Sequence, residues 1–256
     1  MRTLPSLSAL ASRNPGCRIA ADRLRHDRGA ASLRLAAVVL VLGFAPLVAQ
    51  AACSDEPKAK VDWSGCEKQR LIMGKANLQG ARLGGAQFDG SDFAQANLAG
   101  ADLSKSSLDR VRLSGADLAG ANMVQATAYR TNFSAARLVG ADLSKAELIR
   151  ANFKSADLTN ANLERAELLR ITLEGATLTG ANLMSTDLSR ANLGKAKLGG
   201  TKFAHARMFQ TRLEDNDLTA AVVLTQAQLD TACGNAQTRL PAGLKPPSSW
   251  PCPKDD

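Results

Sequence analysis

A hydrophobic repeat of five residues runs through the centre of this chain. From Met73 to Leu218, every fifth residue is Leu, Phe or Met except Ala128, which makes thirty central positions with 21 Leu, five Phe and three Met. Two residues before the central position stands a small residue in most repeats, Ala in 20 of the thirty and Ser or Thr in six. A period of five fits neither the 3.6 residues of a helical turn nor the two-residue alternation of a flat strand. A chain that turns after every fifth residue, in contrast, places all of these side chains inside a coil.

Asn or Asp precedes the central residue in half of the repeats, as in Ala101-Asp102-Leu103 and Ala161-Asn162-Leu163. In this respect residues 73–218 resemble the pentapeptide-repeat proteins. The resemblance implies an all-β fold, a right-handed quadrilateral β-helix in which each pentapeptide forms one side and four make a coil of twenty residues. Thirty repeats then give about 7.5 coils, and a spacing of about 4.8 Å between coils gives a rod roughly 36 Å long. Only 4% of the residues are aromatic, so the interior is built from aliphatic and small side chains.

A column of glycines supports the twenty-residue coil. Two places after the central residue, every fourth repeat has one of Gly80, Gly100, Gly120, Gly140, Asn160, Gly180, Gly200 or Ala220. Glycine and asparagine are the residues that tolerate φ > 0, as a type II turn requires. We therefore expect this corner to need a special backbone and the four sides to be unequal.

A second corner carries a column of arginines, and it contains the candidate interaction residues Arg110, Arg130, Arg150, Arg170, Arg190, Tyr129, Ile149 and Leu169. The last three precede their arginines and are expected to form an exposed apolar strip. Such a mixture is favoured at protein interfaces. The other interpretation is a solvated face, because Glu147, Glu167 and Asp187 lie beside the strip and offer weak lateral ion pairs.

The first 51 residues have the pattern of an export signal. Residues 1–34 carry seven arginines and two acids, Leu35–Ala49 is uncharged, and Ala49-Gln50-Ala51 has the form of a cleavage site. We predict a cleaved signal peptide and a periplasmic or secreted protein, with an N-terminal membrane anchor facing the periplasm as the alternative. Cleavage lowers the net charge from +8 to +3, since 25 basic and 22 acidic residues remain.

Both ends of the rod are expected to be capped. Residues 52–72 form a predicted N-terminal cap with Trp63 as a lid, and the β-helix occupies 73–223. Within 224–256, a capping box at Thr225–Gln228 predicts a short helix to about Cys233, stopped by Gly234, before a proline-rich tail in which Trp250 packs on the last coil.

Cys53, Cys66, Cys233 and Cys252 remain after cleavage. A rod of roughly 36 Å separates the two ends, so only Cys53–Cys66 and Cys233–Cys252 can pair within one chain. The alternative, if the protein is not exported, is free thiols.

Motifs of catalysis are missing from the sequence. It has no glycine-rich phosphate loop, nucleophile elbow or CxxC, and only two histidines. We therefore predict no catalytic, cofactor or metal site, and a non-enzymatic scaffold that acts as a protein-interaction or structural module of the cell envelope. Its partner would be a protein or an anionic envelope component; nucleic acid is disfavoured because stacking aromatics are few. A homodimer through an end or a side of the rod is a further option.

Two other functions stay open. The resemblance implies, as the alternative, a DNA-mimicking protein of the cytoplasm that binds and protects a topoisomerase, although such proteins are strongly acidic and this chain is not. A third option is an enzyme whose site lies on a face of the rod.

Overall fold

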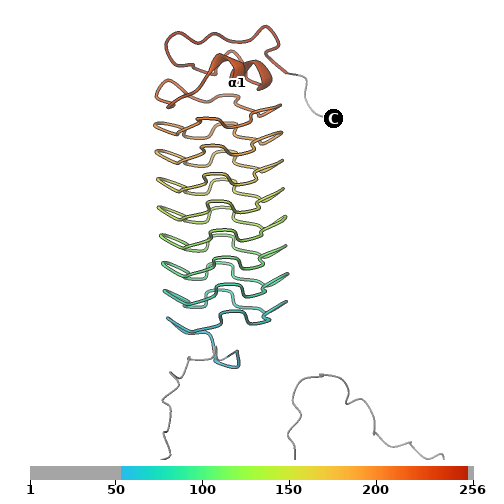
Figure 1. The fold of residues 1–256 in the computed structure, drawn as a ribbon, viewed down its shortest axis with the longest axis vertical. Helices are drawn as coiled ribbons and strands as arrows, with labels where there is room; N and C mark the ends of the chain where they lie inside the picture. Colours follow the sequence, from blue (N-terminus) through green and yellow to red (C-terminus); the bar gives the residue numbers. More distant parts are fainter. Residues whose placement is uncertain (1–52, 253–256) are drawn as a thin grey trace, which may run out of the picture. The chain divides into compact units, whose positions relative to one another are not determined.

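A computed structural model describes residues 53–252, so the predicted signal peptide or anchor at residues 1–51 lies outside the described part. The chain winds into a β-solenoid whose coils stack along one axis (Figure 1). Each five-residue side contributes one residue to a parallel bridge, and bridged residues are twenty apart from Asp62↔Arg82 to Lys202↔Val222. The described residues contain one helix, α1 (Gln226–Thr231), and isolated bridges in place of extended strands.

Backbone hydrogen bonds connect each coil to the next. The N–H of Leu78 donates to the carbonyl of Asn97 at 2.7 Å, and the N–H of Asn97 donates back to the carbonyl of Ala76 at 2.9 Å. Within a corner, the N–H of Ala81 donates to the carbonyl of Leu78 at 3.0 Å. The same three bonds recur around the solenoid, so the buried backbone is satisfied without long strands.

The interior is the column of central and small residues that the repeat predicts. Leu78, Leu103 and Phe153 are at most 1% exposed, and Phe133 stacks on Phe153 with ring centroids 4.4 Å apart. Where threonine replaces the small alanine, its hydroxyl donates to a backbone carbonyl, either of the preceding coil, as Thr201 does to Leu178 at 2.7 Å, or of its own coil, as Thr186 does to Leu183 at 2.8 Å. The substitution therefore leaves no unpaired hydroxyl in the core.

Asn or Asp before the central residue closes the corner that follows. Its Oδ1 accepts the N–H two residues later, as with Ala99 to Asn97 at 3.1 Å and Ser104 to Asp102 at 3.0 Å. These are Asx turns, which supply an acceptor that the coil itself lacks at that position. This contact explains a preference that the sequence pattern showed without a reason.

All four corners have the same left-handed backbone. Positive φ angles occur at Gly80 (62°), Lys105 (57°), Arg150 (59°) and Ser155 (58°), which represent the four columns. The glycine column has the predicted positive φ, but the other three corners share it, so the expected inequality of the four sides is wrong for the backbone. Every side is five residues long and ends in the same turn, so the columns differ only in their side chains.

The solenoid begins earlier than residue 73. Bridges already join Asp62 to Arg82 and Glu67 to Gln87, and Trp63 is fully buried at a central position. Trp63 is thus part of the first coil and not a lid above it, which corrects the predicted boundary of the cap at 52–72. The pattern was hidden because Lys68 takes the next central position, with its amine 4.1 Å from the centre of the Trp63 ring.

At the other end, α1 replaces one side of the last coil. Thr225 caps the helix, and the capping box with Gln228 is formed as predicted. The Gln228 side chain also donates to the carbonyls of Phe203 and Ala206, at 2.7 and 2.9 Å, in the coil beneath. The solenoid pairing then resumes at Cys233, which bridges to Arg212.

The helix ends at Thr231, slightly before the predicted end at about Cys233, because Cys233 is already part of the bridged backbone of the solenoid. Gly234 does not stop the helix: the ring of Trp250 occupies the space that a side chain there would need, at 2.3 Å from the position of a Cβ. The Trp250 indole donates to the carbonyl of Ala232 at 2.7 Å. The tail is thereby held over the last coil, as predicted.

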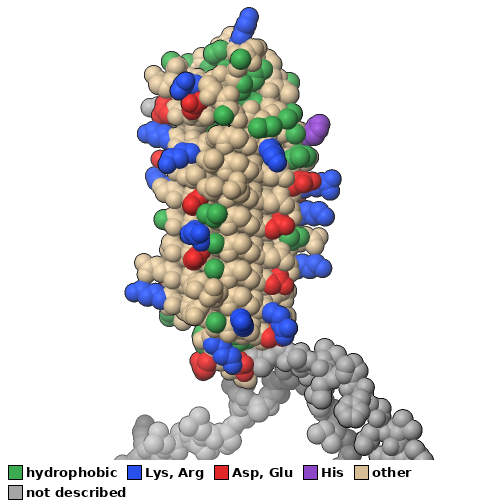
Figure 2. Space-filling model, turned by 90° about the vertical axis from the view of Figure 1, so that its left-hand side faces the viewer, with side chains coloured by type: hydrophobic (Ala, Val, Ile, Leu, Met, Phe, Trp, Pro, Cys, Tyr) green, Lys and Arg blue, Asp and Glu red, His purple; other side chains and the backbone are tan. Residues whose placement is uncertain are grey.

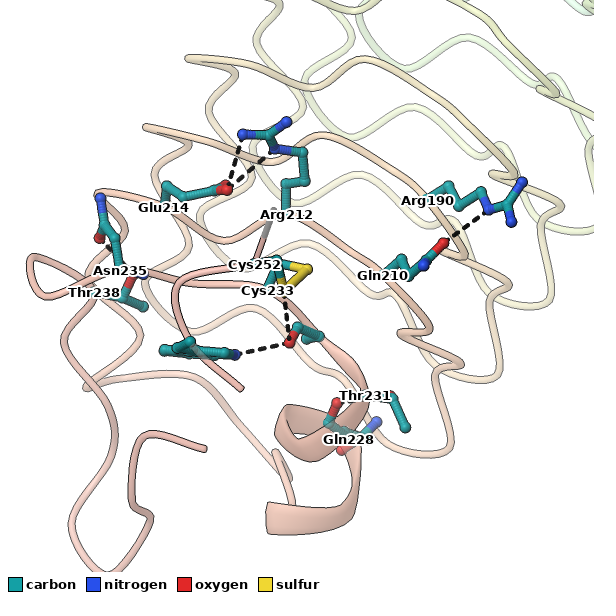
Figure 3. The surroundings of a disulfide bond; sticks show 12 residues. Arg190, Gln210, Arg212, Glu214, Gln228, Thr231, Cys233, Asn235, Thr238 and Cys252 are labelled. Carbon is teal, nitrogen blue, oxygen red and sulfur yellow. Dashed lines mark hydrogen bonds and ion pairs between the residues drawn. A yellow bond between two sulfur atoms is a disulfide. The ribbon is translucent and has the colours of Figure 1, made fainter. Parts of the chain in front are cut away.

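Disulfides close both ends of the described chain. They join Cys53 to Cys66 and Cys233 to Cys252, with Cα atoms 5.6 and 5.4 Å apart. These are the two pairs that the length of the rod allows. The second bond ties the tail to the backbone just after α1 (Figure 3).

Candidate interaction face

The arginine column, defined as Arg110, Arg130, Arg150, Arg170 and Arg190, places one exposed guanidinium on each of five successive coils. Each arginine is the left-handed corner residue, and its N–H is bonded to the next coil, as Arg150 is to the carbonyl of Leu169 at 3.0 Å. Bridges from Glu147 to Glu167 and from Glu167 to Asp187 hold the adjoining sides in register. The backbone of the column is therefore held in place by hydrogen bonds to the neighbouring coils.

The predicted apolar strip lines a surface groove together with three arginines of the column, Arg150, Arg170 and Arg190. We define the strip as Tyr129, Ile149, Leu169 and Phe209. The groove has a volume of about 510 Å³ and is lined by Tyr129, Ile149, Arg150, Leu169, Arg170, Asp187, Ser189, Arg190, Arg207 and Phe209. Arg130 lies at its edge, with its guanidinium carbon 5.0 Å from the centre of the Tyr129 ring. Arg110 is not part of the groove, and Asp109 precedes it in place of an apolar residue.

The strip is less exposed than the sequence predicts. Tyr129, Ile149 and Leu169 are half-buried, and only Phe209 is largely exposed, at 52%. Residues of the strip on neighbouring coils lie side by side and cover one another. Ser189 is 7% exposed and sits between Leu169 and Phe209, so the floor of the groove has a small residue at this point.

Most of the lateral ion pairs expected on this face are not formed. Asp187 pairs with Arg207 at 3.6 Å, but Glu147 and Glu167 pair with no residue between 53 and 252. The five arginines of the column also form no ion pair with a residue between 53 and 252. Arg190 instead donates a hydrogen bond to Gln210 at 2.9 Å. Arginines that precede a central residue behave differently, since Arg112 and Arg137 pair with aspartates of the preceding coil at 3.2 and 3.1 Å.

The strip also presents backbone donors. The N–H of Tyr129 donates to Asp109 at 2.9 Å, whereas the N–H groups of Ile149 and Leu169 meet no acceptor within the described residues. Glutamate, not Asn or Asp, precedes the central residue on these two coils. Its longer side chain does not close the Asx turn at these two positions.

A second hollow, of about 410 Å³, lies beside the C-terminal disulfide and is lined by Phe209, Arg212, Glu214, Cys233 and Cys252 among others. Its charged groups are satisfied internally, because Arg212 and Glu214 pair at 3.0 Å (Figure 3). It therefore offers less to a charged partner than the groove does.

On the face in Figure 2, acidic and basic side chains gather along the two borders and leave a stripe of backbone and polar side chains between them. Within residues 53–252, no group of three His, Cys, Asp or Glu side chains could hold a metal ion. In the same part of the chain, no helix has the length and apolar character needed to cross a membrane.

The described chain is thus a solenoid of five-residue repeats with a groove between the side chains of one face, which is the architecture of a repeat scaffold. The chain belongs to the family of pentapeptide repeats, whose sequence model matches eight copies over residues 72–110, 106–144, 129–165 and 166–204. A comparison with curated protein sequences gave no significant match.

Solved structures of the same family resemble the chain. HetL, involved in heterocyst differentiation regulation in the cyanobacterium Nostoc sp. strain PCC 7120, is 28% identical over 69% of this chain and 85% of its own, with a TM-score of 0.38. A pentapeptide repeat protein of the Arabidopsis thaliana thylakoid lumen is 29% identical over 40% of this chain and 74% of its own, with a TM-score of 0.38. QnrB1, a plasmid-mediated fluoroquinolone resistance protein, is 18% identical over 69% of this chain and 92% of its own, with a TM-score of 0.35.

Proposed function

We propose that this protein is a non-enzymatic, exported scaffold of the cell envelope that binds a protein or an anionic envelope component through the arginine column and the apolar strip. The rod would be a right-handed quadrilateral β-helix of about 7.5 coils or slightly more. The observation that carries the proposal is the set of column arginines without a carboxylate partner among residues 53–252, next to half-buried apolar side chains. Three of the five arginines follow an apolar or aromatic residue, and a face that is charged only for solubility does not need this mixture.

Export is supported by the sequence of residues 1–51 and agrees with two disulfides, which persist in oxidising compartments. Cell fractionation tests it, followed by determination of the N-terminus of the purified protein. We expect a periplasmic or secreted chain that begins just after Ala51. Uncleaved full-length protein in the cytosol would overturn export.

Partner capture tests the interaction face. We expect the full chain to retain a partner from envelope extract, and the double variant Arg150→Glu, Arg170→Glu to lose it. The matched control is the double variant Lys75→Glu, Lys195→Glu, because it reverses two exposed charges at left-handed corners of another column. Equal capture by the double variant would show that the column is only a solvated corner.

The alternative is a DNA-mimicking protein of the cytoplasm that binds a topoisomerase. It requires an acidic surface, whereas the column is basic and the chain after cleavage carries +3. The same capture experiment, made with cytosolic extract, separates the two functions: a retained topoisomerase would favour this alternative.

A further inference from the structure

We propose that the groove binds one amphipathic α-helix of a partner protein, with acidic side chains along the flank that faces Arg150, Arg170 and Arg190. The inference rests on the proposed function, because it names the class of partner that the interaction face takes.

The backbone of this face does not offer a sheet edge. The N–H of Leu148 donates to the carbonyl of Glu167 at 2.9 Å, and the N–H of Arg150 donates to that of Leu169 at 3.0 Å, so the coils pair along the rod and not sideways. A partner strand needs a free ladder of N–H and C=O groups. An apolar groove with charged borders is instead the surface that receives an amphipathic helix.

The spacing of the coils also favours a helix. Successive strip residues lie one coil apart, about 4.8 Å, and successive turns of a helix present side chains on one face every ~5.4 Å. Side chains on one face of an extended segment recur every ~6.8 Å and fall out of step after one coil. From Tyr129 to Phe209 the strip spans four coil spacings, about 19 Å, which matches a helix of about 13 residues.

The charges across the face are ordered. On one coil the order is Glu147, Ile149, Arg150, and on the next coil it is Glu167, Leu169 and Arg170. The apolar strip is thus bordered by acids on one side and arginines on the other. A complementary helix has acids on one flank and bases on the other, and only one direction along the rod satisfies both borders.

The groove has a site for one large side chain. Ser189 lies between Leu169 and the exposed ring of Phe209, and the Asp187–Arg207 pair forms its border. A leucine or aromatic residue of the helix that lies here would contact the apolar side chains of Leu169 and Phe209. A few such anchors carry most of the binding energy of an interface.

The test uses synthetic helical peptides of about 13 residues, with leucines along one face and fluorescence anisotropy as the readout against the full chain. The first peptide has Glu along one flank and Lys along the other; the control peptide has Lys along both. We expect the first to bind about tenfold more tightly, since the column repels the control. The double variant Arg150→Glu, Arg170→Glu should reverse this preference.

Apolar contact is tested separately. Leu169→Ser should weaken the first peptide about tenfold, whereas Val139→Ser, the same repeat position on another side of the rod, should leave binding unchanged. Circular dichroism of each variant verifies the fold. Absence of binding, equal binding of both peptides, or binding insensitive to Leu169→Ser would overturn the proposal; the last result identifies a general anion site.

Failure of this inference is distinguishable from failure of the proposed function. If the double variant loses the envelope partner but neither peptide binds the parent chain, the helical partner is wrong and the proposed function stands. If the uncleaved chain is cytosolic while the peptide results hold, export is wrong and the groove assignment stands.

Discussion

Replacing Arg130, Arg150 and Arg170 together by glycine should stabilise the fold while removing the proposed binding face. Their φ angles are 55°, 59° and 56°, in the left-handed region. A residue with a Cβ costs roughly 1–2 kcal/mol there, and glycine adopts the region freely. The arginines are therefore kept at positions where the backbone favours glycine, as at Gly90 in the same column.

The expected gain is small at each site and additive over the column. Glycine loses about 0.5–1 kcal/mol more backbone entropy on folding than alanine, so the net gain is about 0.5 kcal/mol per site. Neighbouring guanidinium groups about 5 Å apart repel by under ~1 kcal/mol in water, and this repulsion disappears. For three sites we expect about 2 kcal/mol, or an increase in Tm of about 4–8 °C.

Thermal and urea unfolding followed by circular dichroism measure this gain. The matched control is Gly140→Ala, which has φ of 65° and no atom within 4 Å of the added Cβ, so that only backbone strain changes. It should lose about 0.5 kcal/mol, the reverse of the gain expected at each arginine site. The triple alanine variant removes the charges and keeps the strain. A triple glycine variant that is clearly less stable than the parent would refute the reasoning, because the arginine stems would then stabilise the rod by packing.

Three further predictions concern stability at the ends of the rod. Val223→Asn should gain about 1 kcal/mol in urea unfolding, because Val223 is 60% exposed and holds a β-branched side chain at φ 54°; a loss would show that its contacts outweigh the strain. Cys233→Ser with Cys252→Ser should cost about 3 kcal/mol for a loop of 19 residues, and an unchanged Tm would contradict this. Hydrogen bonds from the hydroxyl and then the N–H of Ser64, and the Arg82 guanidinium, lower the pKa of Asp62 from its ordinary 3.8. The stabilisation of the fold by the ionised Asp62 is therefore complete above pH 3.8 and is lost as the pH falls through the lowered pKa. The difference in unfolding free energy between the parent and Asp62→Asn should accordingly shrink below pH 3.8. A difference that stays constant with pH would exclude a contribution from the Asp62 carboxylate.

The core and the ends were largely readable from the sequence. A five-residue period with leucine at its centre has one solution that buries every leucine, and Leu78 and Phe153 are buried accordingly. The capping box at Thr225 predicted the start of α1 because its partners are three residues apart and form a local contact. The cysteine pairs followed from the distance between the two ends of a rod.

The tertiary structure decided the features that depend on contacts between neighbouring coils. The solenoid starts near Val61 because Trp63 fits a central position once Gln87 and Arg82 lie above it, although no leucine marks that repeat. The four corners are equal because all of them adopt the same left-handed backbone turn, whether or not the corner residue is glycine.

The candidate site divides in the same way. The alignment of Arg150 with Arg170, and of Ile149 with Leu169, follows from the period of twenty and was visible in the sequence. The groove was not visible in the sequence, because its shape depends on how the side chains of neighbouring coils pack around Ser189. Nor did the sequence reveal which charges pair, since Asp187 reaches Arg207 on the next coil while Glu147 and Glu167 pair with no described residue. Position along the rod is set by the repeat, whereas contact and charge pairing are set by the side-chain conformations of adjacent coils.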